Sequence, residues 1–495
     1  MPTVSNKHGN TQRIFYPTFN GGLNLSVPNE SMNRNELKEA LNVEFSHLTG
    51  ALRVRGGLVW SARFNDVIDA VVPVRGRRGF LCRAKGTRKL WYFRWNNIWP
   101  VQGELSGDGD LSAATFGETG EVLIASGGKL QRFNDNSFPM IETLDNSPDD
   151  CRLVFVRNGR AGVVEGADTL RFSWVGDCVN WENDPDDEST GQFIEIGYKD
   201  GMNINAVIPL SRDLIIFKCP PDEPDKGIIW RFTGDFPDCA ALEVAHNTGT
   251  FSQRSIQAVG NDVFYVTTSG VANLSSVTSY GEVKTSWPDR KVSNGLTPLI
   301  DETAQLWDVP VKQQLWVLPS INEAQLWVLD YSIGIWTKFE FPKTPVHAAG
   351  IDDRLYVFMG QDLYEVNDYY TQDELYDEGT LDIHAHIRLG TILSGLQTLI
   401  HGAFASFEIM PECNAELLLG KFKLPFSYSG TIDYIYDAPN DTQFAFDDDD
   451  PIFSEGCVLT SRRKCIVRDW SVTPEINISG GGCSLSTIGL LSAEV

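Results

Sequence analysis

The chain has 495 residues, of which 42% are hydrophobic and 11% aromatic, so it can bury the cores of two or three globular domains. Its formal net charge of −25 excludes a protein that grips nucleic acid over its whole surface, because such binding requires phosphates to be neutralised. Residues 1–18 are polar, and no apolar run approaches the ~20 residues of a membrane helix, so we expect neither a signal peptide nor a membrane span.

The charge is unevenly distributed along the chain. Residues 1–100 hold 15 basic and 6 acidic residues, a balance of +9, whereas the remainder holds 26 basic and 60 acidic residues, a balance of −34. This polarity favours contact with an acidic neighbour, which includes another copy of the chain.

The nine cysteines are odd in number and show no C-x-x-C spacing. Disulfide frameworks and zinc sites need paired spacings, so we expect reduced thiols that pack as small apolar residues.

Residues 1–50 are predicted to form an N-terminal arm with one short helix. Asn33 can cap this helix, and Glu36 stands at the position of a capping-box partner. Leu37, Ala40 and Leu41 then share one helical face. A helix this short is unstable alone, so it must dock on another part of the protein.

Residues 51–378 are predicted to form a β-propeller-like domain. From Leu52 onward, short apolar or aromatic runs alternate with turn residues, which is typical of an all-β sandwich, barrel or propeller. Meanders of the length of a four-stranded blade lie within the following segments: 79–99, 118–133, 304–341 and 353–366.

Residues 379–495 are predicted to form a C-terminal β-sandwich. Seven strand-like segments fall within ~115 residues, a density that suits such a fold. The segment 431–436 is one of these strands, and the acidic stretch 441–451 is predicted to be a solvated loop between strands.

No motif predicts catalysis or a cofactor. The chain lacks a G-x-S-x-G elbow, a P-loop, an H-E-x-x-H pair and a dinucleotide fingerprint. A propeller can house a glycosidase with two facing carboxylates, but the Asp-box S-x-D-x-G-x-T-W is absent as well. We therefore expect a protein that is not an enzyme and has no catalytic, cofactor or metal residues.

Two sets of side chains have residue types that can bind a metal ion. His384 and His386 lie at i and i+2 on a predicted strand and face one side, but no third ligand is evident, so two partly exposed histidines are the preferred interpretation. The acidic clusters lack the alternating spacing of a calcium loop and are predicted to be solvated turns. They comprise Asp447 to Asp450, and Asp184, Asp186, Asp187 and Glu188.

An arginine-rich segment from Arg75 to Arg94 carries basic residues with no acid between them. It could contact nucleic-acid phosphates, or an acidic neighbouring subunit. The net charge of the chain favours the protein contact. The candidate contact residues are Arg75, Arg77, Arg78, Arg83, Lys85, Arg88, Lys89 and Arg94.

Several motifs follow one another in a familiar order. They begin with Phe19 to Asn24, a glycine-pair motif, and continue with Glu39 to Val43 and with the Arg-x-Gly turn in Gly50 to Gly57. Later segments follow in order: 215–233, where the run 228–234 follows a strand, then 260–274, 305–341 and 476–495. In these segments the chain resembles the packaged-DNA stabilisation and tail nozzle proteins of short-tailed bacteriophages. The strongly acidic charge and the arginine-rich segment depart from that family's pattern and put a DNA-facing surface in doubt.

The resemblance implies a structural virion protein that assembles, first in the host cytoplasm, as a homohexameric ring below the portal and its adaptor. Such a ring extends the DNA channel, retains packaged DNA, carries tail fibres or spikes and lets double-stranded DNA pass without sequence specificity. The alternative from the residues is a propeller that binds or cleaves glycans as a receptor protein, and a third is a cytoplasmic interaction scaffold.

Overall fold

The computed structural model describes residues 11–494 except 17, 47–49, 75–77, 118–119, 136–137, 222, 278–281, 352, 410–412, 428–456 and 481–482. It divides into two compact units. Residues 58–367 form one unit, which we call the propeller, and residues 1–57 with 368–495 form the other, the terminal domain. The propeller is thus an insertion into a domain built from both ends of the chain.

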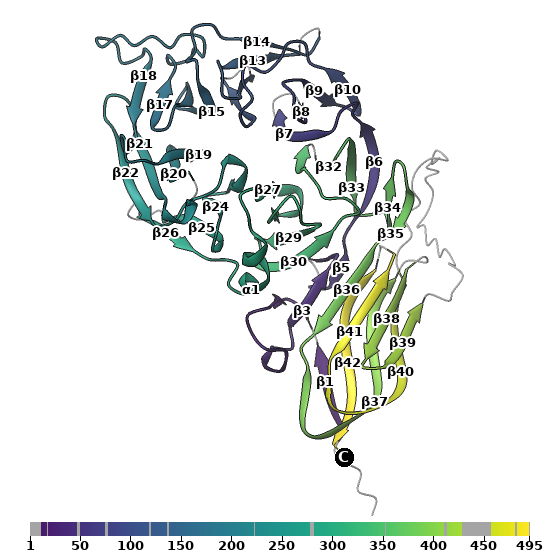
Figure 1. The fold of residues 1–495 in the computed structure, drawn as a ribbon. Helices are drawn as coiled ribbons and strands as arrows, with labels where there is room; N and C mark the ends of the chain where they lie inside the picture. The colour runs from purple at the N-terminus through teal and green to yellow at the C-terminus, as the bar shows by residue number, and fades with distance from the viewer. Residues whose placement is uncertain are drawn as a thin grey trace, which may run out of the picture. The chain divides into compact units, whose positions relative to one another are not determined.

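The described residues of the propeller form seven blades of four antiparallel strands, arranged in a ring (Figure 1). Six of the blades are four-stranded sheets, and the strands of the remaining one, blade 6, belong to a ten-stranded sheet. Blade 1 comprises β7 (Ile68–Val74), β8 (Gly79–Ala84), β9 (Leu90–Arg94) and β10 (Asn97–Pro100). Blade 2 comprises β11 (Ser112–Phe116), β12 (Glu121–Ala125), β13 (Gln131–Asn134) and β14 (Met140–Thr143). Blade 3 comprises β15 (Cys151–Arg157), β16 (Arg160–Glu165), β17 (Thr169–Phe172) and β18 (Gln192–Glu195).

The ring continues through four more blades. Blade 4 comprises β19 (Asn203–Leu210), β20 (Asp213–Cys219), β21 (Ile228–Gly234) and β22 (Cys239–His246). Blade 5 comprises β23 (Ile256–Val259), β24 (Asp262–Thr267), β25 (Gly270–Val277) and β26 (Glu282–Ser286). Blade 6 comprises β27 (Gln305–Val309), β28 (Gln314–Leu318), β29 (Gln325–Asp330) and β30 (Ile335–Glu340). Blade 7 comprises β31 (His347–Ile351), β32 (Arg354–Met359), β33 (Asp362–Asn367) and β6 (Gly57–Arg63).

The ring closes through β6, which precedes blade 1 in the chain but forms the outer strand of blade 7. Residues just after β6 extend this joint, since the Phe64 amide donates to the Gln361 carbonyl at 2.8 Å and the Ile68 amide to the Gly360 carbonyl at 2.9 Å. The first strand of each blade contacts the first strand of the next, from β7 around to β31 and back to β7.

The near-continuous apolar runs in the sequence follow from blade stacking. In β20, Leu214 and Ile216 belong to a buried cluster with blade 3, whereas Ile215 and Phe217 face the opposite way into a cluster with blade 5. Successive side chains of a strand alternate between its faces, so a strand buried on both faces must be apolar at every position. The predicted all-β propeller is therefore confirmed.

The terminal domain consists of two sheets. One sheet holds β1 (Thr11–Tyr16), β4 (Val43–Phe45), β5 (Leu52–Val54), β37 (Ile392–Ile409), β40 (Cys457–Val472) and β42 (Ser484–Glu494). The other holds β2 (Gly22–Leu23), β3 (Glu36–Leu41), β36 (His384–Leu389), β38 (Asn414–Leu419), β39 (Phe422–Ser427) and β41 (Pro474–Ser479). A hairpin joins β34 (Gln372–Leu375) to β35 (Gly379–Asp382).

Helical structure is sparse. Among the residues that the structure describes, it comprises one turn of α-helix, α1 (Ser293–Leu296), and the short 3-10 segments η1 (Asn29–Ser31), η3 (Pro224–Lys226), η4 (Gln253–Ser255), η5 (Thr297–Leu299) and η6 (Pro310–Lys312). In the described part of the chain, no helix has the length and apolarity needed to cross a membrane.

The predicted helix after Asn33 is wrong, because residues 36–41 form strand β3. The expected contact between Asn33 and Glu36 does form, with the Asn33 amide donating to Glu36 Oε2 at 3.1 Å, but it closes the turn that enters the strand. The register of β3 against β36 shifts between Leu37 and Glu39. This bulge brings Leu37 and Ala40, both fully buried, to one side at a spacing of three, which mimics a helical pattern.

The predicted domain boundaries also differ from the two units. Residues 1–50 do not form a separate arm, because β1 pairs with β42 and β3 pairs with β36 inside the terminal domain. Residues 368–378, assigned to the propeller from sequence, belong to the terminal domain as well. The predicted strand 431–436 and loop 441–451 lie outside the described residues.

Candidate functional site

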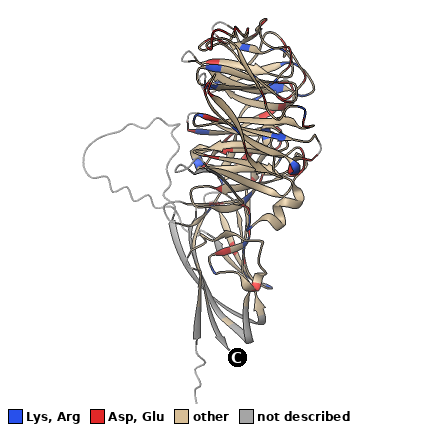
Figure 2. Cartoon of the chain, turned by 90° about the vertical axis from the view of Figure 1, so that its left-hand side faces the viewer, with Lys and Arg blue, Asp and Glu red and all other residues tan. Residues whose placement is uncertain are grey.

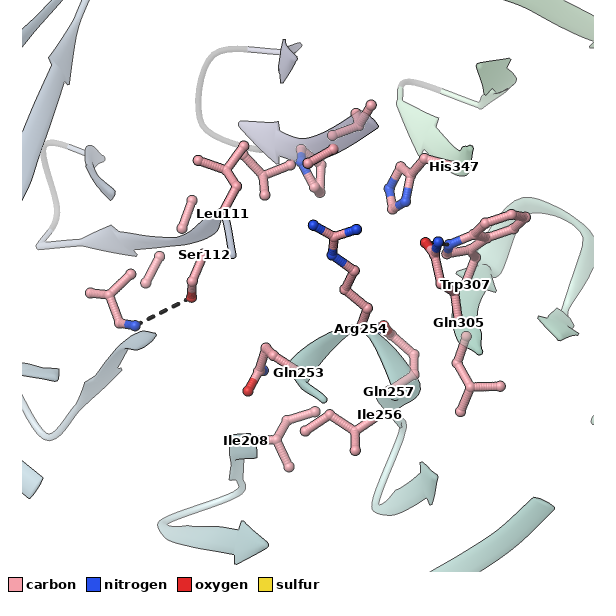
Figure 3. A pocket seen from close by; sticks show the side chains of 18 of the residues that line it. Leu111, Ser112, Ile208, Gln253, Arg254, Ile256, Gln257, Gln305, Trp307 and His347 are labelled. Carbon is pink, nitrogen blue, oxygen red and sulfur yellow. Dashed lines mark hydrogen bonds between the residues drawn. The ribbon is translucent and has the colours of Figure 1, made fainter. Parts of the chain in front are cut away.

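The propeller has a central cavity of about 460 Å³, bounded by the first strand of all seven blades and by η4 (Figure 3). A volume of this size matches small-molecule pockets. It cannot hold a DNA duplex, whose major groove alone is ~12 Å wide. A conduit for DNA would therefore have to lie between copies of the chain, not along the propeller axis.

Arg254 projects from η4 into the middle of this cavity (Figure 3). The η4 turn is fixed by a capping box between Ser252 and Ser255, which sets the direction of the Arg254 side chain. The Arg254 guanidinium contacts Asp110 Oδ1 at 2.8 Å and the carbonyl of Asp69 at 3.5 Å. The side chain thus connects blade 5 to the first two blades.

Arginines pair with Asp69, which lines the cavity, and with Asp110, which does not. Asp110 pairs with Arg254, and Asp69 Oδ1 lies 2.8 Å from Arg83 Nε. Arg83 also donates to the carbonyl of Gly109 at 2.6 Å. Glycoside cleavage uses one protonated and one ionised carboxyl that face each other across the sugar. The lining of the cavity includes one carboxylate, Asp69, which is paired with Arg83.

His347 and Trp307 form the opposite wall of the cavity (Figure 3). Their rings meet edge to face with centroids 5.8 Å apart. Burial, with a smaller contribution from the charge of Arg254, lowers the pKa of His347 to about 3, so its imidazole is neutral near pH 7. Trp307 Nε1 donates to Gln305 Oε1 at 3.3 Å. This wall can offer neutral hydrogen-bonding groups to a small ligand.

Three members of the predicted arginine-rich contact set lie in ion pairs within the propeller. Arg83 pairs with Asp69 as above, Arg88 Nη2 lies 2.5 Å from Asp108 Oδ2, and Arg94 Nη1 lies 3.3 Å from Asp135 Oδ2. Arg94 also stacks over the Trp95 ring at 3.8 Å. Figure 2 shows acidic and basic residues interspersed along the blades. Much of the basic charge of this segment is therefore balanced inside the chain.

The remaining members of that set are placed differently. Arg78, Lys85 and Lys89 are exposed on blade 1, whereas Arg75 and Arg77 lie outside the described residues. A contact with another subunit or with DNA stays a prediction for this segment, and its exposed part is Arg78, Lys85 and Lys89.

His384 and His386 lie on β36, and His384 is exposed. His386 Nδ1 lies 3.2 Å from Glu39 Oε2 on β3, and its Nε2 lies 3.7 Å from Glu475 Oε2 on β41. The hydrogen bond to Glu39 and the two negative charges raise the pKa of His386 against the opposing effect of burial. This histidine thus bridges two neighbouring strands.

The acidic segment 184–188 forms an exposed turn between β17 and β18. Asp184 and Asp187 accept from main-chain amides two residues on, of Asp186 and Ser189 respectively, at 3.0 and 2.9 Å. The other cluster, Asp447 to Asp450, lies outside the described residues. Across the described ranges, no group of three or more His, Cys, Asp or Glu side chains is placed to hold a metal ion.

The cysteine side chains described by the structure are mostly buried. Those of Cys82, Cys151, Cys178, Cys219, Cys413 and Cys483 are buried, and burial raises the pKa of Cys151 and Cys178 to about 12. A thiol with so high a pKa carries almost no thiolate near pH 7 and is a poor nucleophile.

Sequence reasoning missed the buried ion pair of Arg55 and Asp373. Arg55 Nη2 lies 2.6 Å from Asp373 Oδ2, and both side chains are 3% exposed. Arg55 Nε also donates to Asn42 Oδ1 at 3.1 Å. Arg55 belongs to the Arg-x-Gly motif, so the sequence marked this position as unusual. Nothing in the motif indicated its partner Asp373, which lies 318 residues away.

Comparisons with known proteins find similar solved structures but no family. No protein-family model and no curated protein matches it. Similar solved structures include BamB from Moraxella catarrhalis, with 12% identity over 63% of this chain and 96% of that protein, and a TM-score of 0.37. YCF48 bound to D1 peptide has 13% identity, coverage of 64% and 96%, and a TM-score of 0.39.

Enzymes are among the similar structures. An inactive variant of virginiamycin B lyase from Staphylococcus aureus with quinupristin has 10% identity, coverage of 65% and 97%, and a TM-score of 0.38. At such identities and scores, no activity, ligand or partner is carried over to this chain.

Proposed function

We propose that this protein is a structural subunit of a short-tailed phage tail, a nozzle ring below the portal and its adaptor. In this role it extends the DNA channel in the virion, helps to retain packaged DNA and anchors fibres or spikes. It assembles in the host cytoplasm and performs no bond chemistry.

The observation that carries the proposal concerns the segments that resemble that family. Residues 19–24, 39–43 and 50–57 at one end of the chain and residues 476–495 at the other fold together in the terminal domain. They supply β2, the end of β3, the first residue of β4, β5, most of β41 and β42. These outer segments of the resemblance thus share one folded unit, whereas its middle segments, 228–234, 260–274 and 305–341, lie in the propeller that is inserted into it.

Charge supports a conduit formed between copies. Six copies carry a nominal charge of six times −25, and an acidic lumen lets a polyanion pass without adhering to the wall. Rings with sixfold symmetry use unlike surfaces that meet head to tail. The exposed basic residues of blade 1 and the acidic remainder of the chain offer such unlike surfaces.

The interface is tested by charge reversal. The triple variant Arg78→Glu, Lys85→Glu and Lys89→Glu should shift hexamers toward monomers in native mass spectrometry, because favourable contacts with an acidic neighbour become repulsive. The matched control reverses three exposed basic residues of the other blades, Lys199, Arg212 and Lys226, with the same change in net charge. Equal hexamer fractions in the two triple variants would count against this interface.

A further inference from the structure

Two buried arginines face each other across a tight turn between strands β15 and β16. Arg157 ends β15 and Arg160 begins β16, and the two are directly opposite in register. The turn residues Asn158 and Gly159 both have positive φ, 48° and 74°. The Arg157 side chain is 6% exposed and Arg160 is 7% exposed. Like charges directly opposite on paired strands destabilise a sheet, so this placement needs compensation.

Main-chain carbonyls satisfy most of the arginine hydrogen bonds. Arg160 Nη1 donates to the carbonyls of Ser173 and Thr190, each at 2.6 Å, and Arg160 Nη2 donates to the carbonyl of Glu188. Arg157 Nε donates to the carbonyl of Arg212 at 3.0 Å, and its Nη2 to that of Gly234. Carbonyls accept hydrogen bonds but bring no net charge.

Carboxylates neutralise the positive charges of the two arginines only weakly. Asp235 Oδ1 lies 3.8 Å from Arg157 Nη1, and this side chain is 71% exposed. In the part of the chain that the structure describes, Arg160 takes part in no ion pair. The nearby Asp213 is engaged by Arg231 at 2.6 Å, and the Asp187 carboxylate accepts from Ser189. Burial lowers the pKa of both arginines, which reports the cost of keeping them charged there.

The two arginines line a pocket of about 280 Å³ between blades 3 and 4. The rings of Phe172 and Phe236 line it, and Arg160 lies 5.9 Å from the Phe236 centroid. Arg157 lies 4.6 Å from the centroid of a further ring, that of Phe232. Apolar walls exclude water and strengthen charge interactions within the pocket. Asp235 lies at the pocket, and its Oδ1 accepts a hydrogen bond from the side-chain Nδ2 of Asn158. Glu188 also lines it, and its carbonyl accepts from Arg160 while its side chain is exposed.

We propose that this pocket is a binding site for a compact oxyanion, the phosphate or carboxylate group of a small ligand, which displaces Asp235 and is held by Arg157 and Arg160. The site lies apart from the central cavity and does not depend on the proposed tail function.

The test is titration calorimetry on the full chain, with inorganic phosphate and acetate as probes and chloride at matched ionic strength as the blank. Saturable heat with phosphate alone assigns a phosphate-bearing ligand, and saturable heat with acetate assigns a carboxylate. Saturable heat with neither probe overturns the proposal.

Variants separate binding from a structural role of the arginines. Arg160→Gln should weaken binding of the active probe by about 10-fold or more, since charge-assisted hydrogen bonds are lost. Arg152→Gln, on the same strand β15 but bonded to the Gly166 carbonyl, should leave binding unchanged.

Asp235→Asn keeps the test decisive if Arg160→Gln fails to fold. It removes an exposed competing charge and should tighten binding by about three- to tenfold. Unchanged or weaker binding in Asp235→Asn would contradict the proposed displacement.

Discussion

At the residue scale, Lys218 has the most completely enclosed charge among the described lysines. Its side chain is 0% exposed, and Nζ lies 2.7 Å from Asp168 Oδ1 and 2.8 Å from Asp200 Oδ1. The carbonyls of Ile196 and Gly197 accept from it at 2.6 Å each. One ammonium thus ties β20 of blade 4 to the segment that leaves blade 3.

Replacement of Lys218 should be strongly destabilising. Lys218→Met leaves two carboxylates without their cation, and breaking a buried pair from one side typically costs ~3–5 kcal/mol. The matched control is Lys226→Met, whose partner Glu223 and own side chain are more than half exposed, and such pairs contribute about 0–1 kcal/mol. Urea unfolding monitored by tryptophan fluorescence measures the free energy of unfolding of both variants. Similar midpoints for the two variants would contradict the structural role of Lys218.

His386 should make the terminal domain less stable as pH rises. Its folded pKa is raised above the ordinary 6.5 by Glu39 and Glu475, so its stabilising contribution is complete below pH 6.5 and is lost as pH rises through the folded value. His386→Gln should remove this part of the pH dependence, and Glu39→Gln should reduce it. Thermal unfolding between pH 5.5 and 8.5 checks this, and parallel curves for wild type and His386→Gln would refute it.

Residues of the candidate sites were only partly predictable. The arginine-rich segment was evident as a run of like charges, but its acidic partners Asp108 and Asp135 follow later in the chain. Arg254, His347 and Trp307 come from three blades and carry no shared local pattern, so only the closed ring brings them together. The buried partners of Arg55 and Lys218 are likewise long-range.

At the element scale, short apolar runs bounded by turn residues were sufficient to predict strands and parts of four blades, but not the number of blades. The segments 304–341 and 353–366 were assigned as blade meanders, and they contain β27 to β30 and β32 to β33. Residues 36–41 misled the prediction because a bulge gives a strand the apolar spacing of a helix. The seventh blade could not be completed from sequence, since β6 pairs with β33 about 300 residues later.

The closing strand should determine whether the propeller folds alone. A fragment of residues 57–368 contains all seven complete blades and should fold, because its ring is closed. A fragment of residues 64–368 lacks β6 and leaves β33 as an exposed edge, which promotes association between chains. Size-exclusion chromatography and circular dichroism compare the two. A folded monomer without β6 would contradict this role of the strand.

At the scale of the whole molecule, the chain is acidic and carries a propeller inserted into a domain made from both termini. The central cavity of the propeller is of small-molecule size, so the proposed function requires a path for DNA that is created by assembly. The proposed function therefore depends on the quaternary structure more than on any side chain.

Electron microscopy of the purified protein is the decisive measurement of its quaternary structure. The proposed function predicts ring-shaped particles with sixfold symmetry and an opening wide enough for a DNA duplex. Single molecules at every concentration, or rings whose centre is too narrow for a duplex, would contradict it.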